Sequence, residues 1–194
     1  MSLSAPTLRR TLIVIPAARP RLAWALFLVS AGVTLIALSA QVRISIPPSP
    51  VPITGSTLGV LLIAAAYGTR LGTATVTAYA VAGIAGLPVF AGASSGWAVM
   101  QGATGGYIVG FIAAALLVGA LAERGWDRRP WLTVAAMVAG NAVIYACGVL
   151  WLQHFVGWER VWALGVRPFL VGDAIKIAAA AGLLPVAWRL SDRR

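Results

Sequence analysis

Long apolar stretches separated by short polar breaks recur along the sequence and limit the folds open to it. Several of them approach the length of about 20 residues that a helix needs to cross the hydrocarbon core of a bilayer. Hydrophobic residues make up 60% of the chain and charged residues only 10%, whereas a soluble domain averages about 25% charged residues. The sequence therefore predicts an all-α, polytopic membrane protein whose surroundings are the lipid bilayer.

We predict six transmembrane helices within a single membrane domain that occupies residues 1–194. The predicted spans are 22–40, 56–67, 71–87, 104–122, 131–152 and 169–190. The domain is expected to consist of a basic N-terminal segment, the six-helix bundle and a short tail, at residues 1–21, 22–190 and 191–194. The second span is short for a straight crossing, and the sequence Gly-Thr-Arg-Leu-Gly that follows it predicts a tight turn at 68–72.

The arginines are distributed unequally over the two ends of these spans. Of the fifteen basic residues, one is lysine and fourteen are arginine. If both termini are cytoplasmic, eleven arginines lie on the inner side, and only Arg43, Arg160 and Arg167 lie on the outer side. This positive-inside bias predicts an even number of spans with both termini in the cytoplasm. Because most arginines flank apolar segments, the net charge of +10 does not indicate nucleic-acid binding.

The only lysine, Lys176, lies three residues after Asp173 in an apolar, alanine-rich stretch. Residues three apart on a helix share a face. Each charge would cost roughly 2.5–3.5 kcal/mol at the bilayer centre, so such residues normally face a bundle interior or a cavity. We expect a functional site here. The alternative is a self-neutralising pair that only fixes the orientation of the helix.

Two irregular loops are expected on the outer side, at 41–57 and 88–97. The first contains four prolines, which cannot continue a helix and hold the chain extended. Extended backbone at a membrane edge must be buried in protein or line a cavity. Asp173 and Lys176 are expected about one helical turn inside the same face, so the two loops can cover the charged pair.

Common catalytic patterns do not accompany the pair. A P-loop requires a Gly-Lys step, and the only lysine, Lys176, follows Ile175. An intramembrane enzyme that uses Asp173 as general base is the competing hypothesis. Against it, the sequence has no metal-ligand cluster, no Gly-x-Ser-x-Gly elbow and no nucleophile at a suitable spacing from a histidine. We therefore expect a protein that is not an enzyme and needs no cofactor or metal.

Five blocks follow one another along the sequence: ISIP at 44–47 with PVPIT at 50–54, GIAGLPVFAG at 83–92, TGGY at 104–107, GVLWL at 148–152, and GD at 172–173 with Lys176. In this order and spacing they resemble the BioY family, the biotin-binding membrane subunits of energy-coupling factor (ECF) transporters. Four features depart from the family pattern. Ala103 stands where a proline is common, and Ile108 stands where some relatives have an arginine. The sequence GASSG at 92–96 replaces the family's Gly-Gly-Ser/Asn-Gly-Gly loop, and span one has only Ser30 and Thr34 in place of a plain small-xxx-small motif.

The resemblance implies a six-helix subunit that captures biotin in the cell membrane of a prokaryote, with both termini cytoplasmic. It also implies partners, namely a transmembrane coupling subunit and two ATPase subunits that supply the energy. Two alternatives stay open. The chain could act as a solitary biotin facilitator, or its substrate could be a related vitamin.

The resemblance and the chemistry of biotin together suggest the roles of individual residues. We expect Asp173 to accept a ureido N–H and Lys176 to donate to the ureido carbonyl, with Ser94 as a further polar partner. Tyr107 is expected to stack on the bicyclic ring with its hydroxyl towards the wet rim. The alternatives are an interfacial anchor for Tyr107 and a local loop contact for Ser94.

Gln41 and Thr54 complete the expected site. They frame the first outer loop and either line the cavity or stabilise the loop. Asn141 and Tyr145 lie one turn apart in the fifth span and are expected to form hydrogen bonds between helices.

Overall fold

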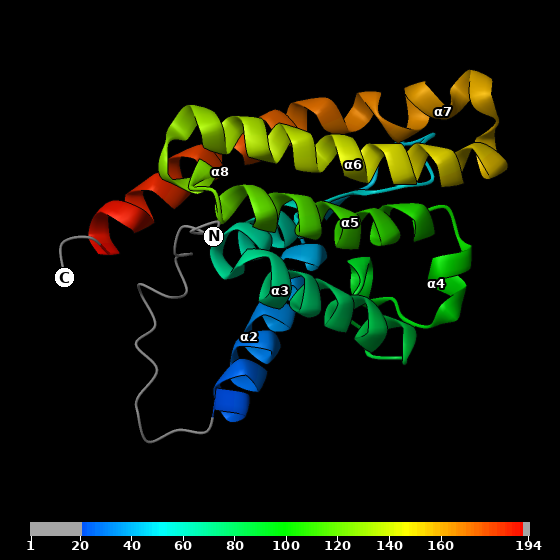
Figure 1. Cartoon of the computed structure of the whole chain (residues 1–194). Helices are drawn as coiled ribbons and strands as arrows, with labels where there is room; N and C mark the ends of the chain where they lie inside the picture. Colours follow the sequence, from blue (N-terminus) through cyan, green and yellow to red (C-terminus); the bar gives the residue numbers. More distant parts are fainter. Residues whose placement is uncertain (1–20, 192–194) are drawn as a thin grey trace.

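A computed structural model describes residues 21–191, so the predictions for the N-terminal segment and the C-terminal tail lie outside the described part of the chain. Helices dominate this part and confirm the predicted all-α class (Figure 1). The long helices are α2 (Arg21–Gln41), α3 (Ser56–Ile84), α5 (Gly105–Ala122), α6 (Pro130–Val156) and α8 (Leu170–Ser191). Each contains at least one predicted span, to within a few residues at its ends.

Short elements lie between the long helices. They are β1 (Arg43–Ile44), β2 (Ile53–Thr54), η1 (Ala91–Ala93), α4 (Trp97–Gln101), η2 (Trp126–Arg128), α7 (Trp158–Gly165) and η3 (Arg167–Phe169). The two strands pair antiparallel, with Arg43 opposite Thr54 and Ile44 opposite Ile53. The proline-rich segment predicted to be extended is thus the loop of a small hairpin.

Within residues 21–191, five helical segments are long and apolar enough to cross a membrane: Leu22–Gln41, Ser56–Ile84, Gly105–Ala122, Pro130–Val156 and Trp158–Leu190. Six spans were predicted, and the difference lies in α3. Gly68 interrupts this helix with φ 77° and ψ −177°, a conformation essentially confined to glycine. A Cβ on Gly72 would lie 2.9 Å from the Cα of Ala64, whereas residues eight apart on an unbroken helix are about 12 Å apart. The chain therefore folds back at Gly68, and α3 contains the second and third predicted spans.

Glycines allow the central helices to approach closely. On α5, a Cβ at Gly106 would lie 2.7 Å from the carbonyl oxygen of Cys147, and one at Gly110 would lie 3.0 Å from the Cα of Ile144. Small residues at four-residue spacing permit such backbone contact between membrane helices. The α5–α6 pair is therefore packed backbone against backbone, which fixes the walls of the site described below.

The irregular elements gather at one end of the bundle. Figure 1 shows α4 and α7 at this end, and the last turns of α8 at the opposite end. Ser49, in the proline-rich loop, donates a hydrogen bond of 2.7 Å to the carbonyl of Leu164 in α7. The two loops predicted on one face thus lie with α7 over the same end of the long helices.

Candidate substrate-binding cavity

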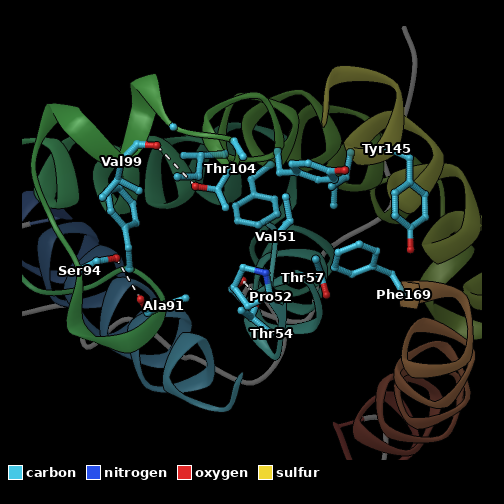
Figure 2. Close-up of a pocket in the computed structure, with 18 of the residues that line it drawn as sticks. Val51, Pro52, Thr54, Thr57, Ala91, Ser94, Val99, Thr104, Tyr145 and Phe169 are labelled. Carbon is cyan, nitrogen blue, oxygen red and sulfur yellow. Dashed lines mark hydrogen bonds between the residues drawn. The ribbon is translucent and has the colours of Figure 1, made fainter. Parts of the chain in front are cut away.

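A cavity of about 310 Å³ lies among the irregular loops and the ends of the long helices (Figure 2). The first loop and the start of α3 contribute Pro50, Val51, Pro52, Thr54, Ser56 and Thr57. The second loop and its continuation into α5 contribute Phe90, Ala91, Ser94, Val99, Gly102, Ala103, Thr104, Tyr107, Ile108 and Phe111. Tyr79, Asn141, Ile144, Tyr145, Phe169, Asp173 and Lys176 complete the lining. Both predicted loops therefore line the same cavity as the charged pair.

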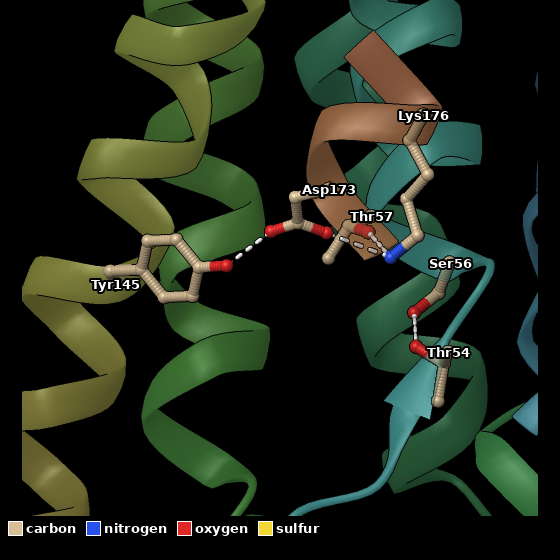
Figure 3. Close-up of polar contacts among 6 residues, drawn as sticks. All are labelled: Thr54, Ser56, Thr57, Tyr145, Asp173 and Lys176. Atoms are coloured by element: carbon tan, nitrogen blue, oxygen red, sulfur yellow. Dashed lines mark hydrogen bonds and ion pairs between the residues drawn. The ribbon is translucent and has the colours of Figure 1, made fainter. Parts of the chain in front are cut away.

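The predicted pair forms the charged part of this lining. Lys176 Nζ lies 2.9 Å from Asp173 Oδ1, and Asp173 is only 5% exposed. The ammonium also donates to Thr57 Oγ1 at 2.8 Å, and the hydroxyl of Tyr145 donates to Asp173 Oδ2. Figure 3 shows these side chains as one chain of contacts from α6 through α8 to the start of α3. The ion pair is thus held by a neighbouring helix on each side.

This arrangement leaves hydrogen-bonding capacity unused on both charges. A carboxylate has about four acceptor positions and an ammonium has three donor protons. Among the described residues, Asp173 accepts one bond at each oxygen, and Lys176 donates two. A ligand that offers a donor and an acceptor side by side can therefore bind without breaking the ion pair. Within residues 21–191, no group of three or more His, Cys, Asp or Glu side chains could hold a metal ion.

Three of the other predicted site residues also line the cavity. Thr54 Oγ1 lies 2.6 Å from Ser56 Oγ, and Ser94 donates to the carbonyl of Ala91 at 2.9 Å. Tyr107 is 7% exposed, and its hydroxyl donates to the carbonyl of Gly165 at 2.8 Å. The hydroxyl therefore does not point to a wet rim as expected, because α7 covers it and offers a backbone acceptor.

Gln41 lies outside the cavity lining and links α2 to the second loop. Its amide nitrogen donates to the carbonyls of Ala37 at 2.9 Å and Phe90 at 3.2 Å. Its amide oxygen accepts a bond of 2.9 Å from the backbone N–H of Ala93. Of the two interpretations given for Gln41, these contacts match loop stabilisation.

The sequence did not identify Tyr145 and Thr57 as the partners of the ion pair. Tyr145 was expected to bond between helices, and its contact with Asp173 confirms this, but nothing in the sequence named the partner. Thr57 belongs to the first predicted loop, which contains several hydroxyl side chains. The sequence does not indicate which of these hydroxyls accepts a hydrogen bond from Lys176. The pairing of Tyr145 with Asp173 could have been predicted by aligning the fifth and sixth spans antiparallel at equal depth in the membrane.

The chain matches the model of the BioY family over residues 13–193. It is 39% identical over 153 residues to the "Probable biotin transporter BioY" of Pyrococcus horikoshii, which covers 79% of this chain and 89% of the relative. It is also 39% identical over 155 residues to the "Biotin transporter BioY" of Thermotoga maritima, covering 79% and 90%.

The fold is also that of a solved crystal structure, the S-component for biotin from an ECF-type ABC transporter. The TM-score is 0.71 at 22% sequence identity, and the match covers 87% of this chain and 90% of the other. With several apolar helical segments in the described part of the chain, the protein is a multi-pass membrane protein of a transporter family. The chain belongs to the BioY family.

Proposed function

We propose that this chain is the biotin-binding membrane subunit of a biotin uptake system in a prokaryotic cell membrane. The observation that carries the proposal is the Asp173–Lys176 ion pair, which faces a cavity with otherwise largely apolar walls. The relatives named above are described as biotin transporters, and biotin itself combines one strongly polar ring with an apolar ring and chain.

The ureido ring of biotin has two N–H donors and one carbonyl acceptor. Asp173 accepts one N–H and Lys176 donates to the carbonyl, each through the capacity that its present contacts leave unused. Residues three apart on a helix have β-carbons about 5–6 Å apart, which suits neighbouring edges of one compact ring. The spacing suits the two distant ends of the ligand less well.

The remaining walls suit the rest of the molecule. The apolar thiophane ring packs against Phe169, Val51 and the ring of Tyr107, while Ser94 and Thr54 offer further hydroxyls. The cavity volume of about 310 Å³ is at the lower end of the roughly 300–1,000 Å³ typical of small-molecule sites. The site is therefore of a size for one small ligand.

Concentrating biotin against a gradient requires energy, and this sequence contains no P-loop. We therefore assign ATP hydrolysis to two partner ATPase subunits, acting through a transmembrane coupling subunit. Helix α2 is the candidate docking surface, because only 17% of its apolar membrane-spanning stretch is buried against the rest of the protein. Ser30 and Thr34 lie on its exposed side and provide small residues for close helix contact.

Equilibrium binding of radiolabelled biotin to the purified protein in detergent tests the substrate. We expect saturable binding at one site per chain that excess unlabelled biotin abolishes and excess thiamine or riboflavin leaves unchanged. Displacement by another vitamin in place of biotin would assign the cavity to that vitamin.

Uptake by a biotin-auxotrophic cell at trace biotin tests the partners. The chain is expressed with and without a coupling subunit and two ATPases, and the expected result is accumulation only when all are present. Equal uptake in partner-free, ATP-depleted cells would instead identify a solitary facilitator.

A further inference from the structure

Asn141, in the middle of α6, has a buried side-chain amide oxygen without a hydrogen-bond partner among the described residues. The residue is 6% exposed, and its Oδ1 makes no hydrogen bond with any of the described residues. Nearly all buried polar side-chain atoms in proteins are hydrogen-bonded, so each exception calls for an explanation. A ligand that supplies the missing partner is one such explanation, because Asn141 also lines the cavity.

The position of Asn141 relates it directly to the ion pair. It lies one helical turn before Tyr145, whose hydroxyl donates to Asp173. Helices α6 and α8 run antiparallel, since Trp188 near the end of α8 bonds to Asp127 just before α6. Because the two helices are antiparallel, moving one turn from Tyr145 to Asn141 on α6 runs in the same direction as moving one turn from Asp173 to Lys176 on α8. Asn141 and Lys176 therefore lie at a similar depth in the bundle. Both residues also line a small void of about 10 Å³ beside the cavity.

We propose that the Asn141 amide is a substrate-binding group that accepts the second ureido N–H of the ligand. This inference rests on the proposed biotin site and completes it. Asp173 can accept one of the two N–H groups and Lys176 can serve the carbonyl between them, which leaves the other N–H without an acceptor. An asparagine amide provides an acceptor oxygen, and the torsion about its Cβ–Cγ bond is soft, so Oδ1 can turn towards the ring.

The other polar residues of the lining are less suited to this role. Thr57 already accepts from Lys176, and Thr54 is paired with Ser56. Ser94 donates to Ala91 in the second loop, and Figure 2 shows it across the cavity from Phe169 and Tyr145. Because the two N–H groups of a ureido ring flank one carbonyl, both acceptors must lie near Lys176, where Asn141 is found.

The test combines changes in the protein with changes in the ligand. Affinities for biotin and for two cyclic carbamates, in each of which one ureido N–H is replaced by oxygen, are measured on the wild type and on Asn141→Leu. Leucine has approximately the shape of asparagine but no polar group. An apolar side chain is well tolerated among the largely apolar surroundings of this position. Asn141→Ala allows the same comparison with a smaller side chain. Gly182→Ala in α8 is the control, because apart from the local helix backbone no atom lies within 4 Å of the added Cβ.

We expect Asn141→Leu to bind biotin about tenfold more weakly or worse. One carbamate should be bound equally by the wild type and the variant, because the N–H that Asn141 accepts is already missing. The other carbamate should lose affinity with the substitution as biotin does. An equal loss for all three ligands, or no loss for biotin, would overturn the role of Asn141 alone. A wild-type protein that binds neither biotin nor the carbamates would overturn the biotin site as well.

Discussion

Asp173 and Lys176 form an ion pair whose two members are each bonded to a second helix, Asp173 by Tyr145 and Lys176 by Thr57. The sequence spacing predicted that the pair shares a helical face, and the cost of placing charges in the bilayer predicted that this face points into the bundle. The identity of its partners could not be predicted, because a contact between helices depends on their rotation and relative depth. The same reason explains why Tyr107 was placed in the cavity correctly but with its hydroxyl in the wrong surroundings.

Removal of either charge should abolish most of the affinity for biotin. Asp173→Asn leaves Lys176 uncompensated in a buried site, and breaking such a pair costs about 3–5 kcal/mol. We expect biotin affinity to fall at least about a hundredfold in Asp173→Asn, and likewise in Lys176→Met. Asp127→Asn is the matched control, since Asp127 is 2% exposed but does not line the cavity. Near-wild-type affinity in folded Asp173→Asn protein would contradict the assignment.

Asp127 is itself a source of pH dependence, at the far end of α8 from the site. Burial raises the pKa of its carboxyl, although the hydrogen bond from Trp188 and the nearby Arg128 act in the opposite direction. Because the folded state disfavours the ionised carboxylate, Asp127 contributes to the free energy of unfolding at low pH, where its carboxyl is protonated. This contribution is lost as the pH rises from the ordinary carboxyl pKa of about 3.9 through the raised folded value.

Asp127→Asn cannot ionise and should lack this loss. Thermal unfolding in detergent, measured from low to neutral pH, should show the variant gaining stability relative to the wild type as the pH rises. A difference between the two proteins that stays constant across this range would mean that Asp127 does not titrate in the expected direction.

Among the elements, the long helices follow from the apolar stretches, and their ends lie close to the predicted boundaries. The short elements do not follow from the sequence. Helix α7, eight residues long, lies in the predicted loop between the fifth and sixth spans, and so short a helix is stable only through tertiary packing. The hairpin of β1 and β2 likewise depends on its contacts, with only two residues in each strand.

The fold-back of α3 is the element that the sequence predicted most specifically, and it depends on Gly68. Gly68→Ala forces an alanine into a backbone conformation that costs on the order of 1–3 kcal/mol. We expect the unfolding temperature in detergent to fall by several degrees, whereas Gly182→Ala, in the helical and open surroundings of α8, should leave it unchanged or raise it. Equal stability of Gly68→Ala and the wild type would show that the turn does not require glycine.

At the scale of the whole molecule, the two ends of the bundle differ. The cavity lies under the irregular loops, and the Asp127–Trp188 contact lies at the other end of α8, fifteen residues or about 22 Å along the helix from Asp173. The arginine distribution predicts that the cavity end faces outwards. Biotin would then enter from the outside, and the partner subunits would dock from the cytoplasm.

Reporter fusions test this orientation. A reporter fused after Arg194 should be active in the cytoplasm, and one inserted near Gly157, between α6 and α7, should be active outside. Gly157 suits an insertion because, apart from the glycine and its two neighbours in the chain, no atom lies within 4 Å of the position that its Cβ would occupy. A C-terminal reporter active only outside would reverse the topology and place the cavity on the cytoplasmic face.

The most direct test of the central claim is a crystal structure of the protein grown with biotin. We expect one biotin in the cavity, with a ureido N–H at hydrogen-bond distance from Asp173 and the ureido carbonyl at the same distance from Lys176, about 2.7–3.2 Å. The thiophane ring should lie against Phe169. Biotin bound with its ureido ring away from both charges, or bound outside the cavity, would contradict the account.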